Sequence, residues 1–241
     1  MNTPDLLGKG IYTIADAARI VHTYPRNISR WSEGYSFPLK SKRIGSSLPI
    51  LLTKTYKLDE KSILTFEQLM EIRLINLFRS KGVKLPVIRA AAQRASHIFG
   101  TDHPFAVKGL ATDGKEIFRI DPSEIQDLNR ATAAENLALG QRVIGQFLEP
   151  YLLQLEYDDF DVARFWALPH KYRIVLDPQR SFGQAIDVRS GVPARVLYSK
   201  VWAGEPIDRV AKWYGVDNQS VRDATDYGES FKPKSAQRLA A

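Results

Sequence analysis

The sequence of 241 residues predicts a mainly α-helical fold with small β elements, and three observations lead to this class. Several segments repeat apolar residues at the three- and four-residue spacing of amphipathic helices. Shorter β-branched and apolar runs, broken by turn residues, indicate small hairpins between those helices. Two segments near opposite ends of the chain match the spacing of a helix-turn-helix, in which two short helices cross at a tight turn.

Composition is that of a folded chain with one large domain or two small ones. Apolar residues make up 44% and charged residues 25% of the sequence, and cysteine is absent. Without cysteine there is no disulfide, no thiolate metal site and no cysteine nucleophile. No apolar run approaches the ~18 residues of a membrane-spanning helix, and the first residues lack the pattern of a secretory signal. We therefore expect a cytoplasmic protein.

Charge is distributed unevenly around a net value of +7. Residues 19–57 contain eight Lys or Arg and a single acid, Glu33, whereas residues 116–161 contain ten acids and three arginines. A basic segment suits the phosphate backbone of a nucleic acid. The acidic segment would be repelled by that backbone and suits a basic protein instead.

The N-terminal segment predicts two short helices followed by a hairpin. Thr13 is placed to cap a helix over 14–21, residues 22–24 form the break, and Pro25 suits the first turn of a second helix that ends near Gly34. The β-branched and apolar residues of 36–58 predict a two-stranded wing, with its turn at the Gly-Ser-Ser sequence of residues 45–47.

The middle of the chain predicts further helices and one hairpin. Apolar residues at helical spacing predict a helix from residue 66 that Gly82 closes, and a second helix from Pro86 to Gly100. Residues 105–120 predict a hairpin around Asp113 and Gly114. Ser123 then opens a predicted long helix that extends to about residue 149, and Pro150 kinks or ends it.

The last third predicts short strands and then helices. A boundary is expected within 156–170, short strands within 171–177 and 183–198, and helices within 205–228. The expected division is a DNA-binding domain over 1–100, an acidic linker, dimerisation or partner-binding segment over 101–170, and a third domain over 171–241.

Two helix-turn-helix units follow from residue spacing. The motif needs a small residue where the helices cross, a left-handed turn residue four positions later, and an apolar residue six positions further on. These positions are Ala18, His22 and Ile28 in the first unit and Ala211, Gly215 and Val221 in the second. Histidine tolerates the left-handed conformation better than most residues, and Asp217 is well placed to cap the last helix.

Charge separates the roles of these two units. Residues 205–226 carry a net charge of −2, so the second unit is expected to serve packing, dimerisation or partner binding, with Arg222 as a weaker candidate contact. The first unit lies in the basic segment and is predicted to contact DNA. Its candidate residues for the major groove are Arg26, Asn27, Ser29 and Arg30. The candidate residues that contact phosphates from the wing are Lys40, Lys42 and Arg43. Trp31 is expected to pack inward, and a solvated charged face is the alternative interpretation.

The N-terminal sequence resembles the MerR-type winged helix-turn-helix. The resemblance is carried by "YTIADAARIVHTYPRNISRW", the predicted wing, and "LTFEQLMEIRLINLFRSKGVKLPVIRAAAQRA". Two departures from the family are Asp16, where glutamate is usual, and Tyr24, where Ser or Thr would cap the recognition helix. The family positions that follow the wing are matched by Phe66, Leu69, Ile72, Leu77, Gly82 and Ile88.

Residues 180–229 resemble the domain of unknown function 433, which often forms the antitoxin half of type II toxin–antitoxin pairs. The pattern includes a Gly-x-Pro strand and the helices of "GVPARVLYSKVWAGEPIDRVAKWYGVDNQSVRDATDYGE". A MerR-like head with this tail is similar to a VapB-type antitoxin. That resemblance implies a dimer that binds and represses its operator and neutralises a PIN-type or PIN-like ribonuclease toxin.

Catalytic and metal-binding constellations are not evident. His97, Asp102 and His103 have no strong metal-site spacing and are interpreted as a surface loop, while the aspartates of 158–161 are interpreted as a solvated linker rather than a Mg²⁺ site. We expect no enzymatic activity, no cofactor and no metal.

An apolar and aromatic stripe lies among the acids of 148–166 and has two interpretations, a core or a surface that caps a nuclease. The candidate partner-binding residues are Tyr151, Leu155, Asp158, Asp159, Phe160 and Arg222. Two other functions stay open: a MerR-like transcriptional regulator whose residues 100–175 bind a small ligand, and an adaptor protein without DNA binding.

Overall fold

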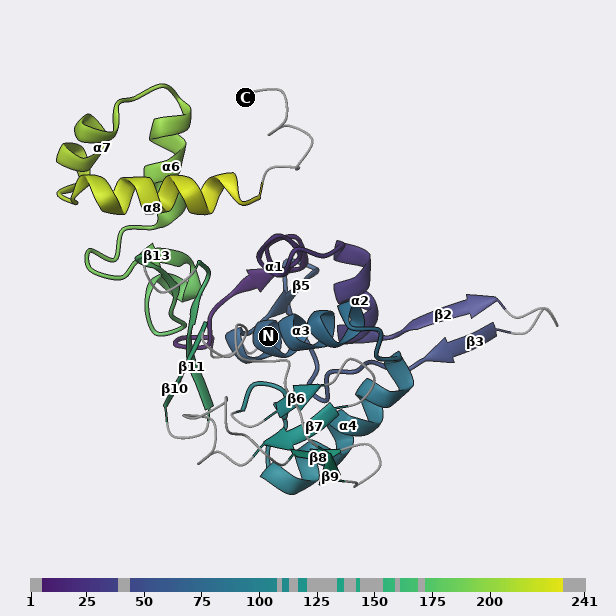
Figure 1. The fold of residues 1–241 in the computed structure, drawn as a ribbon. Coiled ribbons are helices and arrows are strands. Elements are labelled where there is room, and N and C mark those ends of the chain that lie inside the picture. The colour runs from purple at the N-terminus through teal and green to yellow at the C-terminus, as the bar shows by residue number, and fades with distance from the viewer. Residues whose placement is uncertain are drawn as a thin grey trace.

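The fold is mixed α/β, with more strand than the sequence predicted (Figure 1). The computed structural model describes residues 6–38, 44–107, 110–112, 117–120, 134–136, 142–143, 154–158, 161–168 and 172–231. Helices α1–α4 form one group, and helices α6–α8 lie together at the opposite end. The four-stranded sheet formed by residues 155–187 lies between the two groups. Among the described residues, no helix has the length and apolar character that crossing a bilayer requires.

The N-terminal helices confirm the predicted boundaries. After β1 (Tyr12–Thr13) come α1 (Ile14–Val21) and α2 (Pro25–Glu33). Thr13 caps α1 by accepting a hydrogen bond from the Asp16 amide at 3.1 Å. Trp31 is buried, as expected.

The predicted single wing is wrong, because residues 35–64 form two hairpins. The first pairs β2 (Tyr35–Pro38) with β3 (Ile44–Ser47), and Figure 1 shows it projecting from the body. Residues 45–47, the predicted turn, lie inside β3, where Gly45 pairs with Phe37. The second hairpin pairs β4 (Tyr56–Leu58) with β5 (Lys61–Leu64) across Asp59 and Glu60, whose positive φ angles are those of a type I′ turn. β5 also pairs with β1.

Two long helices confirm the periodicity of residues 66–99. α3 (Phe66–Ser80) begins with a capping box between Thr65 and Gln68, and α4 (Leu85–Phe99) ends at left-handed Gly100. Together with α1 and α2 they enclose the first hydrophobic core. Its largest fully buried side chains are Phe66, Phe78, Ile28, Ile50, Leu64, Leu69, Ile72, Ile75 and Ile88.

The hairpin predicted over 105–120 is confirmed by the pairing of β6 with β7, and its turn residues Asp113 and Gly114 lie outside the described residues. The long helix predicted over 123–149 is contradicted by the strands at 134–136 and 142–143, and the rest of that segment lies outside the described residues. β6 (Leu110–Thr112), β7 (Ile117–Ile120), β8 (Ala134–Asn136) and β9 (Arg142–Val143) form an antiparallel sheet in that order. The apolar positions that suggested the helix leave a gap from Leu128 to Leu137, so they never formed a continuous helical face.

A four-stranded sheet begins within the segment where the domain boundary is expected, and the boundary itself stays a prediction. β10 (Leu155–Asp158) pairs with β11 (Asp161–Trp166), followed by β12 (Ile174–Leu176) and β13 (Ala185–Asp187). The strand predicted within 171–177 is confirmed. Within 183–198, where short strands were also predicted, β13 is the one strand. Pro193 caps the N-terminus of helix α6 (Ala194–Trp202), so the end of this segment is helical.

The C-terminal helices enclose a second core. α6, α7 (Ile207–Tyr214) and α8 (Asn218–Glu229) bury apolar side chains against β12. Ile174 belongs to this core, whereas Leu176 on the same strand belongs to the first. The sheet therefore joins the two cores, and the proposed domain division near residue 170 stays a prediction.

The N-terminal segment is tied to residues far along the chain. The Tyr12 hydroxyl donates to the Gly183 carbonyl at 2.7 Å, and the Ile11 amide donates to the Phe182 carbonyl at 2.9 Å. The Gln179 side chain also donates to the Gly8 carbonyl at 3.3 Å. Residues 8–12 are thus fixed against residues 179–183.

Replacing Asp217 with alanine is expected to lower the free energy of unfolding by about 1 kcal/mol. Its side chain caps α8 by accepting from the Ser220 amide at 2.8 Å and also pairs with Arg173. The pKa of Asp217 is lowered to about 2 by Arg173 and by the Ser220 amide. A group with a lowered pKa stabilises the fold above its unfolded pKa, so this contribution should disappear as pH falls from about 4 towards 2. Chemical denaturation checks it, with exposed Asp208→Ala as the control.

Candidate nucleic-acid interface

The turn between α1 and α2 has the geometry that the spacing predicted. His22 is left-handed, with φ 54° and ψ 50°, and the Thr23 amide donates to the Ala18 carbonyl at 2.9 Å. Ala18 and Ile28 are buried where the helices meet. Tyr24 precedes α2 without a side-chain capping bond, which leaves the start of α2 to Pro25.

The second helix-turn-helix unit, near the C-terminus, has the same turn geometry as the first. Gly215 is left-handed between α7 and α8, with φ 64°, and Ala211 and Val221 are buried. Arg222 is exposed on α8.

The outer face of α2 carries the predicted polar residues. Arg26 is exposed, and Arg30 is half-buried with its guanidinium 4.5 Å from the centre of the Tyr35 ring. Asn27 donates to the Thr23 hydroxyl at 3.2 Å, and Ser29 donates to the Pro25 carbonyl at 3.3 Å. Arg26 and Arg30 are therefore available to an external anion, whereas Asn27 is also bonded to the turn before α2 and Ser29 to the first residue of α2.

A second cationic group lies beside α2 that sequence reasoning missed. A cavity of about 350 Å³ between α2 and α3 is lined by Asn27 and Arg30 on one side and by Asn76, Arg79 and Ser80 on the other. Arg79 donates to the Val83 carbonyl at 2.7 Å, and Asn76 donates to the Val21 carbonyl at 3.1 Å. Two guanidinium groups at one polar cavity suit a phosphate. The sequence feature that could have identified Arg79 as a candidate is its position in the last helical turn before Gly82.

The hairpin β2–β3 is fixed to the helices at its base. Arg89 of α4 donates to the Leu48 carbonyl at 2.6 Å, the Ser47 hydroxyl at 3.1 Å and the Pro49 carbonyl at 3.2 Å. The predicted wing residues Lys40, Lys42 and Arg43 lie in the connection between the two strands, outside the described residues.

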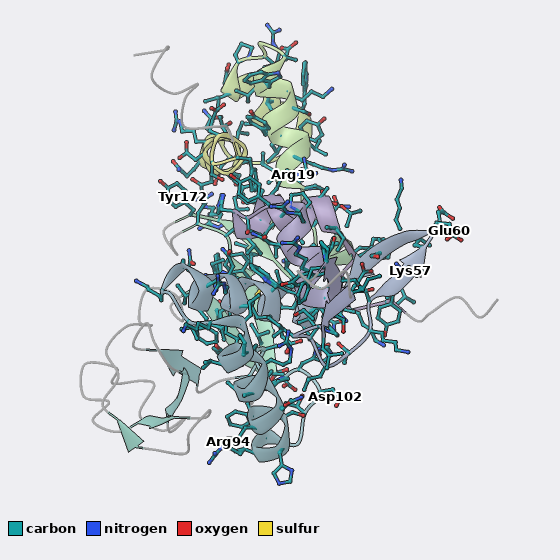
Figure 2. The ribbon with its side chains drawn as sticks, turned by 90° about the vertical axis from the view of Figure 1, so that its right-hand side faces the viewer. Arg19, Lys57, Glu60, Arg94, Asp102 and Tyr172 are labelled. Atoms are coloured by element: carbon teal, nitrogen blue, oxygen red, sulfur yellow. The ribbon has the colours of Figure 1, made fainter. Side chains whose placement is uncertain are left out.

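Glu33, the single acid of the basic segment, joins α2 to the second hairpin. It accepts hydrogen bonds from Ser62 at 2.5 Å, Lys57 at 3.2 Å and Thr55 at 3.4 Å. The Ser62 bond, with the help of Lys57, lowers the pKa of Glu33 despite partial burial. Lys57 on β4 (Figure 2) is thus an ion-pair partner, not a free basic group.

The candidate partner-binding residues are only partly described. Leu155 is half-buried on β10 and packs against the first core, Asp158 is exposed at the end of the same strand, and Arg222 lies apart on α8. Trp166, from the same stripe, is half-buried and donates to Glu156 at 2.8 Å. Tyr151, Asp159 and Phe160 lie outside the described residues. For Leu155, the core interpretation fits.

Two exposed tryptophans were missed by the sequence interpretation. Trp202 at the end of α6 is 66% exposed, and Trp213 on α7 is 55% exposed. Large aromatic side chains in solvent are typical of interaction surfaces.

The surface-loop interpretation of residues 97–103 is wrong for His103. His103 Nδ1 lies 2.9 Å from Glu71 Oε2, and His103 Nε2 lies 3.4 Å from Glu67 Oε2. Burial disfavours its charged form, but the hydrogen bond and charge of Glu71, with Glu67, outweigh burial and raise the pKa of His103. Burial also raises the pKa of Glu71. Within the described residues no metal-ligand cluster of three such groups occurs.

The fold is similar to one determined by crystallography. The crystal structure of Rv2018 from Mycobacterium tuberculosis matches with a TM-score of 0.61 at 24% identity, covering 88% of this chain and 96% of that one. No family model matches the sequence.

A relative from the same organism carries a functional name. A Mycobacterium tuberculosis protein named "Putative antitoxin VapB45" is 28% identical over 222 residues, which cover 90% of this chain and 92% of the relative. The similarity to an antitoxin therefore extends over most of both chains.

Proposed function

We propose that the protein is the antitoxin of a type II toxin–antitoxin system and binds operator DNA through α2 and the β2–β3 hairpin. The observation that carries the proposal is the position of Arg26 and Arg30 on the outer face of α2, beside a projecting hairpin. Arg26 is exposed, and the Arg30 guanidinium lies against Tyr35 on that hairpin. In this winged helix-turn-helix arrangement, α2 enters the major groove and the hairpin follows the backbone.

The name of the relative and the two resemblances support the antitoxin function. As a VapB-type antitoxin, the protein acts in the cytoplasm as a dimeric repressor, has no enzymatic activity and needs no cofactor. A dimer would place two recognition helices about 34 Å apart, or a multiple of that spacing, on a palindromic operator.

The toxin partner in this proposal is a PIN-type ribonuclease. Such an enzyme binds RNA, so its active-site rim is basic and suits the acidic segment 116–161. The exposed Trp202 and Trp213 supply a second, apolar contact surface on α6 and α7. Arg222, also exposed, lies on the adjacent α8.

Replacing Arg26 or Arg30 with alanine is expected to weaken binding to the DNA upstream of the gene by about 1–3 kcal/mol each if the side chain reads a base. Arg26→Ala should leave folding unchanged because that side chain is exposed. Gel shifts at several salt concentrations check both variants, with exposed Arg209→Ala on α7 as the control. A loss that is equal on unrelated DNA, with a flatter salt dependence, would indicate a phosphate contact. Unaltered binding by both variants would contradict α2 as the DNA-reading element.

Co-expression with the product of the adjacent gene tests the toxin part separately. The expected result is a stable complex, and toxicity when the neighbour is expressed alone. A neighbour that is no nuclease and that cells tolerate would overturn the antitoxin function while leaving DNA binding intact.

The alternative function is a MerR-like regulator that binds a small ligand through residues 100–175. The structure describes only part of that segment. A ligand for that segment would raise the melting temperature, and the increase would grow with the logarithm of ligand concentration relative to Kd. An adaptor without DNA binding would give no salt-dependent gel shift.

A further inference from the structure

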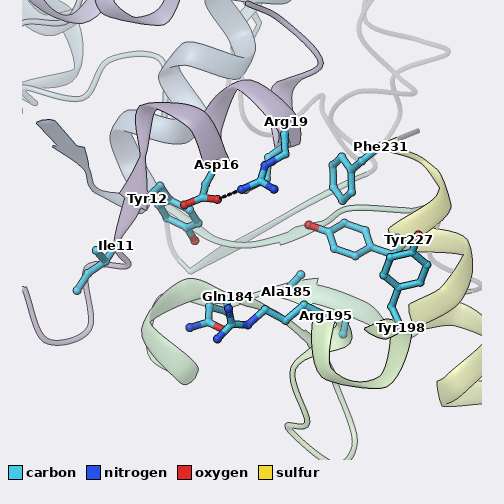
Figure 3. Close-up of a pocket in the computed structure, with 13 residues that line it drawn as sticks. Ile11, Tyr12, Asp16, Arg19, Gln184, Ala185, Arg195, Tyr198, Tyr227 and Phe231 are labelled. Carbon is cyan, nitrogen blue, oxygen red and sulfur yellow. Dashed lines mark hydrogen bonds and ion pairs between the residues drawn. The ribbon is translucent and has the colours of Figure 1, made fainter. Parts of the chain in front are cut away.

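A cavity lies between the N-terminal helix α1 and the C-terminal helices. It measures about 590 Å³ and receives side chains from residues 11–20 on one side and from residues 184–231 on the other (Figure 3). This volume is in the range of small-molecule sites. It is distinct from the polar cavity beside α2.

Aromatic side chains form one wall of the cavity. Tyr198 extends from α6, Tyr227 from α8, and Phe231 follows α8. The rings of Tyr227 and Phe231 meet edge to face, with centroids 4.8 Å apart. A Cβ at Gly228 would come within 2.4–2.6 Å of the Tyr198 ring, so glycine leaves the space in which that ring lies. Ile11, Ile20, Ala185 and Ala194 supply further apolar surface.

Of the charged groups that line the cavity, one cation has no ion-pair partner among the residues that the structure describes. Arg19 forms an ion pair with Asp16, and Asp16 also accepts a hydrogen bond from the Thr13 hydroxyl at 2.6 Å. Arg195 also lines the cavity, and no other described residue forms a hydrogen bond or ion pair with it. The net charge of the lining is therefore positive.

A hydroxyl group is also available inside the cavity. Figure 3 shows the Tyr227 hydroxyl pointing into the space below Arg19. Within the described part of the chain it has no hydrogen-bond partner. Burial is the main reason that the pKa of Tyr227 is raised, so the group stays protonated and can donate. The Tyr12 hydroxyl, by contrast, is already bonded to the Gly183 carbonyl.

We propose that this cavity binds a small aromatic anion, such as an aromatic carboxylate. The ring of the ligand stacks among Tyr198, Tyr227 and Phe231, its carboxylate pairs with Arg195, and the Tyr227 hydroxyl donates to it. Arg195 is exposed on α6, so water solvates its guanidinium when the cavity is empty. An anion would pair with this guanidinium, whereas a cation would be repelled by it and a neutral ring would gain no charge–charge attraction. The site goes beyond the proposed antitoxin function and does not depend on it.

The ligand would also act on the α1–α2 unit. Asp16, Arg19 and Ile20 line the cavity from α1, and the Phe231 ring stacks on the His22 ring with centroids 5.9 Å apart. His22 is the left-handed turn residue between α1 and α2. A ligand that fixes Phe231 therefore restrains the turn that orients α2.

Titration of the full chain with 2-naphthoate and its neutral isostere 2-naphthamide, followed by calorimetry, tests the proposal. We expect 2-naphthoate to bind at least tenfold more tightly than 2-naphthamide. Arg195→Ala should abolish this preference, whereas Lys200→Ala, which removes a charge from an exposed position on the same helix, should retain it. Hydrogen exchange should slow at residues 22–33 when 2-naphthoate is bound.

Each contrary result would overturn a specific part of the proposal. Equal binding of the two probes, or equal loss in both variants, refutes the anion site. Binding without slower exchange at residues 22–33 refutes the coupling. If Arg195→Ala alters folding, Ala185→Leu provides the second test, because added volume on β13 should exclude both probes; undiminished binding would place them elsewhere.

Discussion

Gly34→Ala is expected to lower the free energy of unfolding by about 3 kcal/mol and to displace the β2–β3 hairpin. Gly34 joins α2 to β2 with φ 77° and ψ −176°, a region that is almost restricted to glycine. A Cβ there would lie 2.5 Å from the Ser47 carbonyl oxygen and 3.2 Å from the Pro49 ring. Both contacts are at the base of the hairpin, so the backbone must move.

Gly100→Ala is the matched control, because that residue also has a positive φ, of 66°, but nothing lies within 4 Å of its Cβ position. Its expected cost is only about 1 kcal/mol. Urea denaturation of both variants measures the difference. Equal costs would show that the contact with residues 47–49 contributes nothing.

Glu71→Ala is expected to lower the free energy of unfolding by about 3 kcal/mol, the lower end of the cost of breaking a buried ion pair. Glu71 is 1% exposed and accepts hydrogen bonds from His103 at 2.9 Å and the Phe105 amide at 3.4 Å. Its loss leaves that amide and a half-buried imidazole without their carboxylate. Glu67→Ala is the control: Glu67 is 47% exposed, so its pair should contribute less than about 1 kcal/mol.

The same pair predicts a pH dependence. The pKa of His103 is raised in the folded protein, so its contribution is fully present below pH about 6.5 and is lost as pH rises through the folded pKa. Stability measured from pH 6 to 9 should therefore fall in the wild type, and the fall should be smaller in Glu71→Ala. An identical slope in both proteins would contradict the assignment to His103.

Local patterns predicted the two helix pairs well. The spacing of Ala18, His22 and Ile28 predicted a crossing, a left-handed turn and a buried anchor, because each requirement restricts the residue at a fixed position. Thr13 and Asp217 likewise act within their own helical turn. The helices of 66–99 each bury one face in the core, and the spacing of their apolar residues predicted that face.

Strand pairing was predicted poorly because it depends on partners distant in sequence. Residues 45–47 have turn composition, yet the pairing with β2 makes them part of a strand. The aspartates of 158–161 have the composition of a solvated linker, yet Asp158 and Asp161 pair at the ends of β10 and β11. The same reason hid the contacts of Arg89 and the aromatic cavity, because both form only when segments distant in sequence come together.

The bonds between residues 8–12 and 179–183 have a consequence for biosynthesis. A ribosome releases the first helices long before residue 183 has been translated, so β1 has to wait for its distant carbonyl partners. Nascent or proteolysed chains that end before residue 183 would lack these bonds, and β1 would be held only by its pairing with β5 and by the first core. Residues 8–12 should therefore reach their final position only close to the completion of synthesis.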